Sequence, residues 1–186
     1  MVAIPITEAK PGVSIEINGN LFLVMDYKHN KTAQQANIKI KMKNMITGAI
    51  FENSFRPAEK VEKAHIEYKN MQYLYHSQDD YTFMDQSNFE QVTLTKDKIG
   101  EAAGYIKEDT VVTLMYYKDM VIGINIPNST VLKVVETEPG FKGDTVSGAM
   151  KPAKLETGIS VQVPLFVNEG DMIKVDTRSG KYIERA

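Results

Sequence analysis

The sequence predicts an all-β protein made of three small β-barrels in tandem. Runs of alternating apolar and polar residues recur along nearly the whole chain of 186 residues, and turns rich in Gly, Pro, Asn and Asp separate them. The runs fall into three segments of similar length, which we predict to be domains: 1–64, 65–126 and 127–186. A β segment of about 60 residues closes best as a small barrel, because closure removes unpaired strand edges.

The first segment begins with a hairpin pattern around Asn18-Gly19. Apolar residues occupy every second position on both sides of this turn: Val13, Ile15, Ile17, then Leu21, Leu23 and Met25. Asn-Gly is a strong hairpin signal, because both residues accept the positive φ of a type I′ turn. Residues 37–45 form a further strand, with Ile38, Ile40 and Met42 on one face and Lys39, Lys41 and Lys43 on the other. The polar residues 28–37 are expected to form the loop before it.

The middle and last segments repeat the strand pattern with two exceptions. Residues 96–106 are the one predicted helix, since apolar residues recur there at helical spacing. Residues 136–158 carry four glycines and two prolines, and we expect them to form a long loop. A loop of this length inside a compact β unit is usually functional.

Composition excludes several classes of protein. The chain has no cysteine, so disulfides, thiolate metal sites and cysteine nucleophiles are ruled out. No apolar run approaches the roughly 18 residues that span a membrane, and the start lacks the zones of a signal peptide. The three histidines, His29, His65 and His76, do not show metal-ligand spacing, and no nucleotide-binding or nucleophile-elbow motif is present. We therefore expect a cytoplasmic protein without a metal or a cofactor, and the sequence shows no catalytic motif.

Charge is unevenly distributed along the chain. The total is −2, but residues 1–64 carry net +3, residues 65–126 net −5 and residues 127–186 net zero. This asymmetry suits a protein whose basic first segment lies near phosphate and whose acidic middle segment faces a different kind of surface. Scattered surface charges would give equally small sums.

Five lysines and no acidic residue lie between positions 28 and 43: Lys28, Lys31, Lys39, Lys41 and Lys43. Such a basic patch suits a phosphate backbone. The alternative is an edge strand whose lysines block aggregation. Similarly, Tyr73, Tyr75 and Tyr81 are either a platform for stacked bases or part of a barrel wall, and the alternating pattern favours the wall.

The stretch ETEPGFKGDTVSGAMKPAKLETG at 136–158, with the following VQVPLFVNEGDMIKVDTRSGKYIERA, resembles the C-terminal domain of the elongation factor P family. The resemblance extends back through MQYLYHSQDDYTFMD, IGEAAGYIKED and VIGINIPN to KPGVSIEINGNLFLVMDY and KIKMKNMITG, and so covers essentially the whole chain. It implies an N-terminal SH3-like (KOW-type) barrel followed by two OB-fold barrels in an L-shaped, tRNA-like arrangement.

The same resemblance implies a non-enzymatic, monomeric translation factor. Such a factor binds both ribosomal subunits and rRNA between the P and E sites, beside the P-site peptidyl-tRNA. It stimulates peptide bond formation at stalls such as consecutive prolines. The proline ring constrains the approach of the reacting groups, and the factor contributes by positioning the peptidyl-tRNA. The alternatives are a paralogue that prefers other stall sequences, or an OB-type module that binds RNA without ribosomes. Salt-sensitive affinity for free RNA would favour the module, and turnover by the purified protein would indicate an enzyme.

Site residues follow from the resemblance position by position. Gly143, Asp144 and Thr145 match the segment that contacts the D-arm of the P-site tRNA. Tyr182 and Arg185 match positions associated with ribosome and tRNA contacts, where Arg pairs with phosphate and Tyr stacks.

The tip loop of the first domain departs from the P-G-K-G pattern of many family members. The residues expected near the CCA end of the tRNA are Lys31, Thr32, Ala33, Gln34 and Gln35. Counting from either side places Ala33 or Gln34 at the modified position, and neither accepts a lysine-type modification. Lys31 is the nearest basic residue for a loop-modifying enzyme. Behind the tip, rRNA and tRNA phosphates are expected to contact Lys28, Lys39, Lys41 and Lys43.

Overall fold

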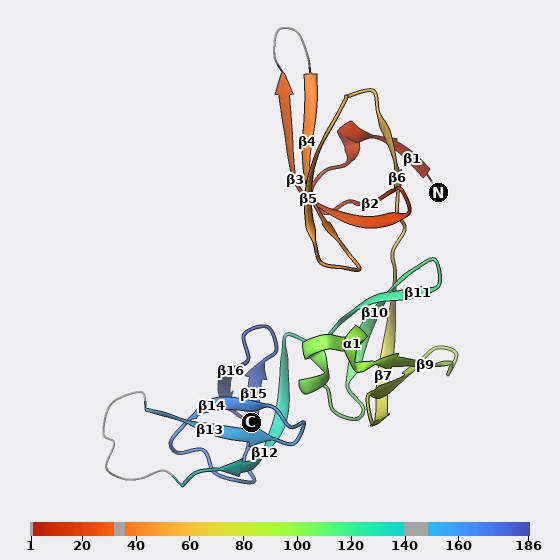
Figure 1. Ribbon diagram of the computed structural model, residues 1–186. Helices are drawn as coiled ribbons and strands as arrows, with labels where there is room; N and C mark the ends of the chain where they lie inside the picture. The colour runs from red at the N-terminus through yellow and green to blue at the C-terminus, as the bar shows by residue number, and fades with distance from the viewer. Residues whose placement is uncertain (1, 32–35, 140–148) are drawn as a thin grey trace. The chain divides into compact units, whose positions relative to one another are not determined.

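The computed structural model describes residues 2–31, 36–139 and 149–186, and it is all-β as predicted (Figure 1). Sixteen strands in this part of the chain form one six-stranded and two five-stranded sheets. By contact density the chain divides into two compact units, Met1–Tyr68 with Met115–Gly123, and Lys69–Leu114 with Ile124–Ala186. No helix within the described residues is long and apolar enough to cross a membrane.

The first sheet has the strand order β1-β6-β2-β3-β4-β5. Its strands are β1 (Val2–Pro5), β2 (Ser14–Ile17), β3 (Asn20–Lys31), β4 (Ala36–Asn44), β5 (Ile50–Phe55) and β6 (Lys60–Lys63), with a 3-10 turn, η1, at Ile6–Glu8. The predicted hairpin at Asn18-Gly19 is confirmed, and both residues have positive φ. Ile38, Ile40 and Met42 are buried in the core.

The sequence pattern misjudged β3 in two ways. The register shifts between Val24 and Asp26, which inserts an extra residue there. The core of this sheet takes Phe22 and Val24, Leu21 is buried in a separate cluster, and Met25, at the shift, is 45% exposed. The predicted loop 28–37 was also too long, because β3 continues to Lys31 and pairs there with the start of β4.

The middle sheet has the order β11-β10-β7-β8-β9. Its strands are β7 (Glu67–Ser77), β8 (Asp80–Asp85), β9 (Gln91–Thr95), β10 (Val111–Tyr117) and β11 (Met120–Asn125). The predicted helix 96–106 is only one α-turn, α1 (Lys96–Ile99), followed by the 3-10 segment η2 (Gly100–Gly104). The α-turn ends where Gly100 adopts a positive φ of 62°, a conformation outside the helical region.

The last sheet has the order β14-β13-β12-β15-β16, and its two edge strands also contact each other. Its strands are β12 (Ser129–Thr137), β13 (Met150–Leu155), β14 (Ser160–Pro164), β15 (Met172–Asp176) and β16 (Lys181–Arg185). β13 lies inside the predicted loop 136–158, so that prediction was wrong for its second half. A loop was expected there because of the glycines and prolines of residues 136–158, but the strand accommodates Pro152, since the pairing of β12 with β13 already ends at Ala153.

Candidate functional site

The β3–β4 hairpin carries the predicted lysine face. Figure 1 shows the two strands continuing beyond the rest of the first sheet. Lys39, Lys41 and Lys43 are exposed, because each alternates with a buried apolar residue of β4. Lys28 is opposite Lys39 on β3 and adds to the same face. The structure thus brings these four predicted lysines together.

Two carboxylates from neighbouring strands lie on this lysine face, which the sequence run from 28 to 43 did not reveal. Asp26 of β3 is opposite Lys41 and forms an ion pair with Lys28 at 3.5 Å. Glu52 of β5 is also opposite Lys41 and forms an ion pair with Lys39. Hydrogen bonding from Lys39 lowers the pKa of the Glu52 carboxyl. The face is therefore a mixed but mainly cationic surface, with Lys41 and Lys43 as its cations outside the ion pairs of the described chain.

The tip residues Thr32, Ala33, Gln34 and Gln35 lie outside the described residues. Lys31 ends β3, and its backbone pairs with Ala36. Gly143, Asp144 and Thr145 also lie outside the described residues. The roles expected for residues 32–35 and 143–145 stay predictions.

Two side-chain hydrogen bonds join the end of β12 to the start of β13. Lys151 is 4% exposed and donates from Nζ to the main-chain oxygen of Glu138 at 2.6 Å. Thr137 donates its hydroxyl to the oxygen of Pro152 at 2.9 Å. A buried ammonium group needs such a partner, because desolvating an unpaired charge is costly. Sequence reasoning missed Lys151, since a lysine at an inward-facing strand position resembles a surface residue.

Tyr182 and Arg185 both lie on β16, at one edge of the last sheet. Tyr182 is half-buried against the core of that sheet, whereas the side chain of Arg185 is 58% exposed. The guanidinium of Arg185 is 4.0 Å from the Asp171 carboxylate, so it is only loosely paired. Arg185 can therefore turn toward an external anion, while Tyr182 is anchored.

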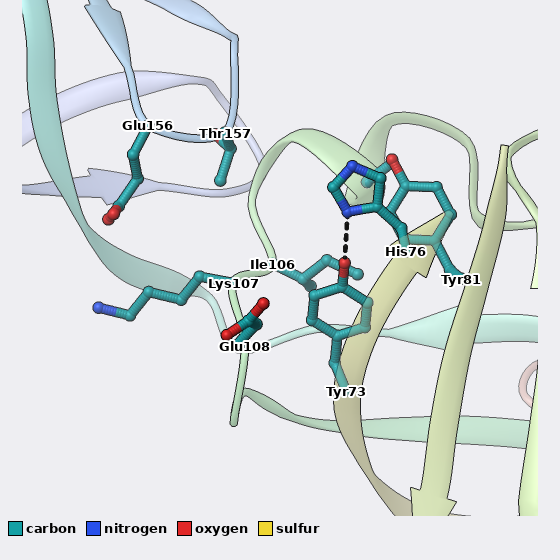
Figure 2. A pocket seen from close by; sticks show the side chains of 9 residues that line it. Tyr73, His76, Tyr81, Ile106, Lys107, Glu108, Glu156 and Thr157 are labelled. Atoms are coloured by element: carbon teal, nitrogen blue, oxygen red, sulfur yellow. Dashed lines mark hydrogen bonds between the residues drawn. The ribbon is translucent and has the colours of Figure 1, made fainter. Parts of the chain in front are cut away.

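A pocket of about 350 Å³ lies in the second unit, beside β7 and β8 (Figure 2). The exposed imidazole of His76 stacks on the buried ring of Tyr81, with 5.1 Å between ring centroids and an interplanar angle of 16°. The Tyr73 hydroxyl is hydrogen-bonded to His76 Nδ1 at 2.8 Å. Burial, with smaller contributions from Tyr81 and Glu108, raises the pKa of Tyr73 to about 12, so Tyr73 stays neutral. The wall interpretation is confirmed for Tyr73 and Tyr81, but Tyr75 is 51% exposed.

The pocket is closed on its other side by the turn between β13 and β14. Thr157 of this turn donates its hydroxyl to the main-chain oxygen of Gly104 at 2.6 Å. A Cβ atom at Gly104 would collide with the Ile159 side chain, so only glycine permits this close approach. Tyr105 packs against the core of the last sheet. These contacts preform the pocket. Sequence reasoning missed it because its walls come from three separate segments.

Within the first unit, a group of three polar side chains joins β2 to the end of β10 and the turn after it. The Tyr117 hydroxyl donates to the Glu16 carboxylate, and Lys118 Nζ lies 2.9 Å from the same group. Hydrogen bonds from Lys118 and then Tyr117 lower the pKa of Glu16. This is a structural ion pair rather than a catalytic arrangement, because its three groups satisfy one another.

The histidines do not come together. His29, His65 and His76 are all exposed and lie on different segments. Across the residues that the structure describes, no group of three or more His, Asp or Glu side chains could hold a metal ion.

Three sheets in tandem, with a basic hairpin on the first, define a multi-domain β protein with a surface suited to nucleic acid. Three domain families match the chain in order. Residues 6–61 match "Elongation factor P (EF-P) KOW-like domain", residues 66–124 "Elongation factor P (EF-P) OB domain" and residues 130–185 "Elongation factor P, C-terminal". The chain belongs to the elongation factor P family of translation elongation factors.

Similar proteins agree with this assignment. Elongation factor P of Acetivibrio thermocellus is 51% identical over 95% of this chain and 96% of its own length. Elongation factor P of Dictyoglomus thermophilum is 46% identical over 98% of this chain and all of its own. The structure of eukaryotic translation initiation factor 5A from Methanococcus jannaschii is similar in fold, with a TM-score of 0.54 and 18% identity over 68% of this chain and 94% of that one. The resemblance read from the sequence is thus confirmed.

Proposed function

We propose that this chain binds the ribosome between the P and E sites, beside the P-site peptidyl-tRNA, and stimulates peptide bond formation at stalls such as consecutive prolines. The observation that carries the proposal is the match to elongation factor P proteins along at least 95% of the chain, through all three domain families. The chain acts in the cytoplasm by positioning the tRNA and contributes no catalytic group of its own.

In this proposal the β3–β4 hairpin is the segment nearest to the CCA end of the P-site tRNA, where the peptide bond forms. Lys28, Lys39, Lys41 and Lys43 contact phosphates of rRNA and tRNA, which their exposure on one face supports. Lys31 and residues 32–35 lie near the CCA end. The domains 1–64, 65–126 and 127–186 act as the three barrels of the factor, with residues 143–145 at the D-arm.

A paralogue with another stall preference is the second candidate. The observation that favours it is the tip sequence Lys31-Thr32-Ala33-Gln34-Gln35, which lacks the P-G-K-G pattern. If Lys31 substitutes for the usual modified residue, Lys31→Ala lowers activity more than Lys43→Ala does. The reverse order would identify the lysine face as the more important feature.

The direct test is translation in a purified system. Messages that encode three consecutive prolines, and matched messages with three alanines, are translated with and without the protein. We expect faster synthesis through the proline run and no change on the alanine message. No acceleration on the proline message would exclude the proposed function, and acceleration of a different stall sequence would establish the paralogue.

Arg185 provides a residue-level test. Arg185→Ala is expected to weaken binding to ribosomes that carry P-site tRNA by about fivefold, since a charge-assisted contact contributes on the order of 1 kcal/mol. Lys181→Ala, an exposed cation on the same strand, is the control. Equal affinities for the wild type and the Arg185 variant would refute this assignment.

A further inference from the structure

The pocket beside β7 and β8 has the features of a receptor for a cationic side chain, and nothing in the proposed function uses it. We propose that it binds an arginine side chain from a basic protein partner. The inference does not depend on the proposed function, because it concerns a site on the isolated chain. It rests on an aromatic wall, two carboxylates and a preformed shape.

The aromatic wall presents a flat and oriented surface. The His76 imidazole is exposed and stacks on Tyr81 (Figure 2). The hydrogen bond from Tyr73 fixes the ring at its Nδ1 atom. A guanidinium group is planar and weakly hydrated, so it stacks favourably on such a ring.

The charges around the wall favour a cation. Glu108 lies beside Tyr73, whereas Glu156 lines the far side of the opening, on the turn between β13 and β14, with its carboxylate directed away from the rings (Figure 2). Glu156 Oε1 accepts the backbone N–H of Lys133 at 2.9 Å, which holds the carboxylate in place and leaves its second oxygen for another donor. Lys107 is the one cation among the lining residues, and Figure 2 shows its ammonium group directed away from the rings.

The surroundings carry the same sign. Residues 65–126 hold ten acidic and five basic side chains, and the aromatic wall belongs to this segment. A phosphate backbone entering the pocket would meet two carboxylates, so RNA is disfavoured there. A basic protein segment is attracted by the same field.

The size and rigidity of the pocket suit one side chain. Its volume of about 350 Å³ is at the lower end of the roughly 300–1,000 Å³ typical of ligand sites. The hydrogen bond from Thr157 to Gly104 joins the walls before any ligand arrives. Little reorganisation is therefore required on binding.

The test is a titration of the full, isotope-labelled chain with N-acetyl-arginine amide, followed by NMR. N-acetyl-citrulline amide is the neutral probe of matched shape, and AMP tests for a nucleotide instead. We expect saturable shifts at Tyr73, His76 and Thr157 with the arginine probe, and affinity at least about fivefold weaker for the citrulline probe. The absence of saturable shifts with the arginine probe would overturn the proposal.

Variants that remove either a negative or a positive charge from the pocket distinguish a cationic ligand from a nucleotide. Glu108→Gln and Glu156→Gln should each weaken the arginine probe about threefold, whereas Lys107→Ala should strengthen it. Glu101→Gln, an exposed acid on η2 outside the pocket, is the control and should change nothing. Tighter binding of AMP than of the arginine probe, lost in Lys107→Ala, would show that the site takes nucleotides and would refute the proposal.

Discussion

The lysine face of the β3–β4 hairpin and the pocket beside β7 and β8 are both built on antiparallel strands, but they differ in how their charge is assembled. The lysine face comes from the alternation of Lys39, Lys41 and Lys43 along one strand. The two carboxylates that line the pocket belong to Glu108 and Glu156, which lie 48 positions apart in the sequence and on separate segments. A surface made by one strand is local, whereas a surface made by several segments depends on how closely they pack.

The largest expected effect comes from separating the walls of the pocket. Gly104→Ala places a Cβ against the Ile159 side chain, and this overpacking should lower the free energy of unfolding of the second unit by about 1–3 kcal/mol. Denaturant unfolding measures the loss, and arginine-probe affinity should fall with it. Gly123→Ala is the matched control, because its Cβ meets only the terminal methyl of Met115, which can rotate away. Equal stability of both variants would contradict the close packing described here.

The next effect concerns the lysine face alone. The double variant Lys39→Gln with Lys41→Gln should weaken ribosome binding about tenfold and reduce the slope of log affinity against log salt by about 1.5, because two phosphate contacts are lost. Lys60→Gln with Lys63→Gln, on β6, removes the same charge elsewhere on the first sheet. If both double variants lose affinity equally, net charge rather than this face controls binding.

The smallest expected effect involves a carboxylate that belongs to neither surface. A hydrogen bond from the Arg178 guanidinium, and then backbone N–H groups of Ser179 and Arg178, hold the pKa of Asp176 well below its usual range. The folded-state pKa is depressed, so the stabilisation is present above the unfolded pKa of about 4 and is lost as the pH falls. Asp176→Asn should lose less stability than the wild type between neutral pH and pH 2. Parallel stability curves would show that this carboxylate contributes nothing.

Alternation and turn signals predicted much of the fold. They identified the all-β class, the turn at Asn18-Gly19 and the two faces of β4, because each of these depends on neighbouring residues. They missed β13, because the glycines and prolines of residues 136–158 indicate a loop, and no local pattern indicates the contact of the buried Lys151 with Glu138. They also extended the helix beyond Gly100, whose positive φ interrupts it.

The candidate site residues also divide into those that a local sequence pattern indicates and those that only the fold brings together. The four lysines of the hairpin were predicted as a group, and the structure places them on one face. Asp26 and Glu52 were not expected there, since only strand pairing brings them beside Lys41. The pocket could not be predicted, because its residues share no spacing in the sequence. The tip residues 32–35 and residues 143–145 rest on the resemblance alone.

The most direct test of the central claim is photocrosslinking on the ribosome, since the lysine face should meet RNA and the pocket should meet protein. A photoreactive phenylalanine analogue replaces either Ser54, which is opposite Lys39 on β5, or Lys107 at the pocket. We predict that the Ser54 crosslink is removed by nuclease and the Lys107 crosslink by protease. RNA crosslinked at both positions, or protein at Ser54 and RNA at Lys107, would contradict the account.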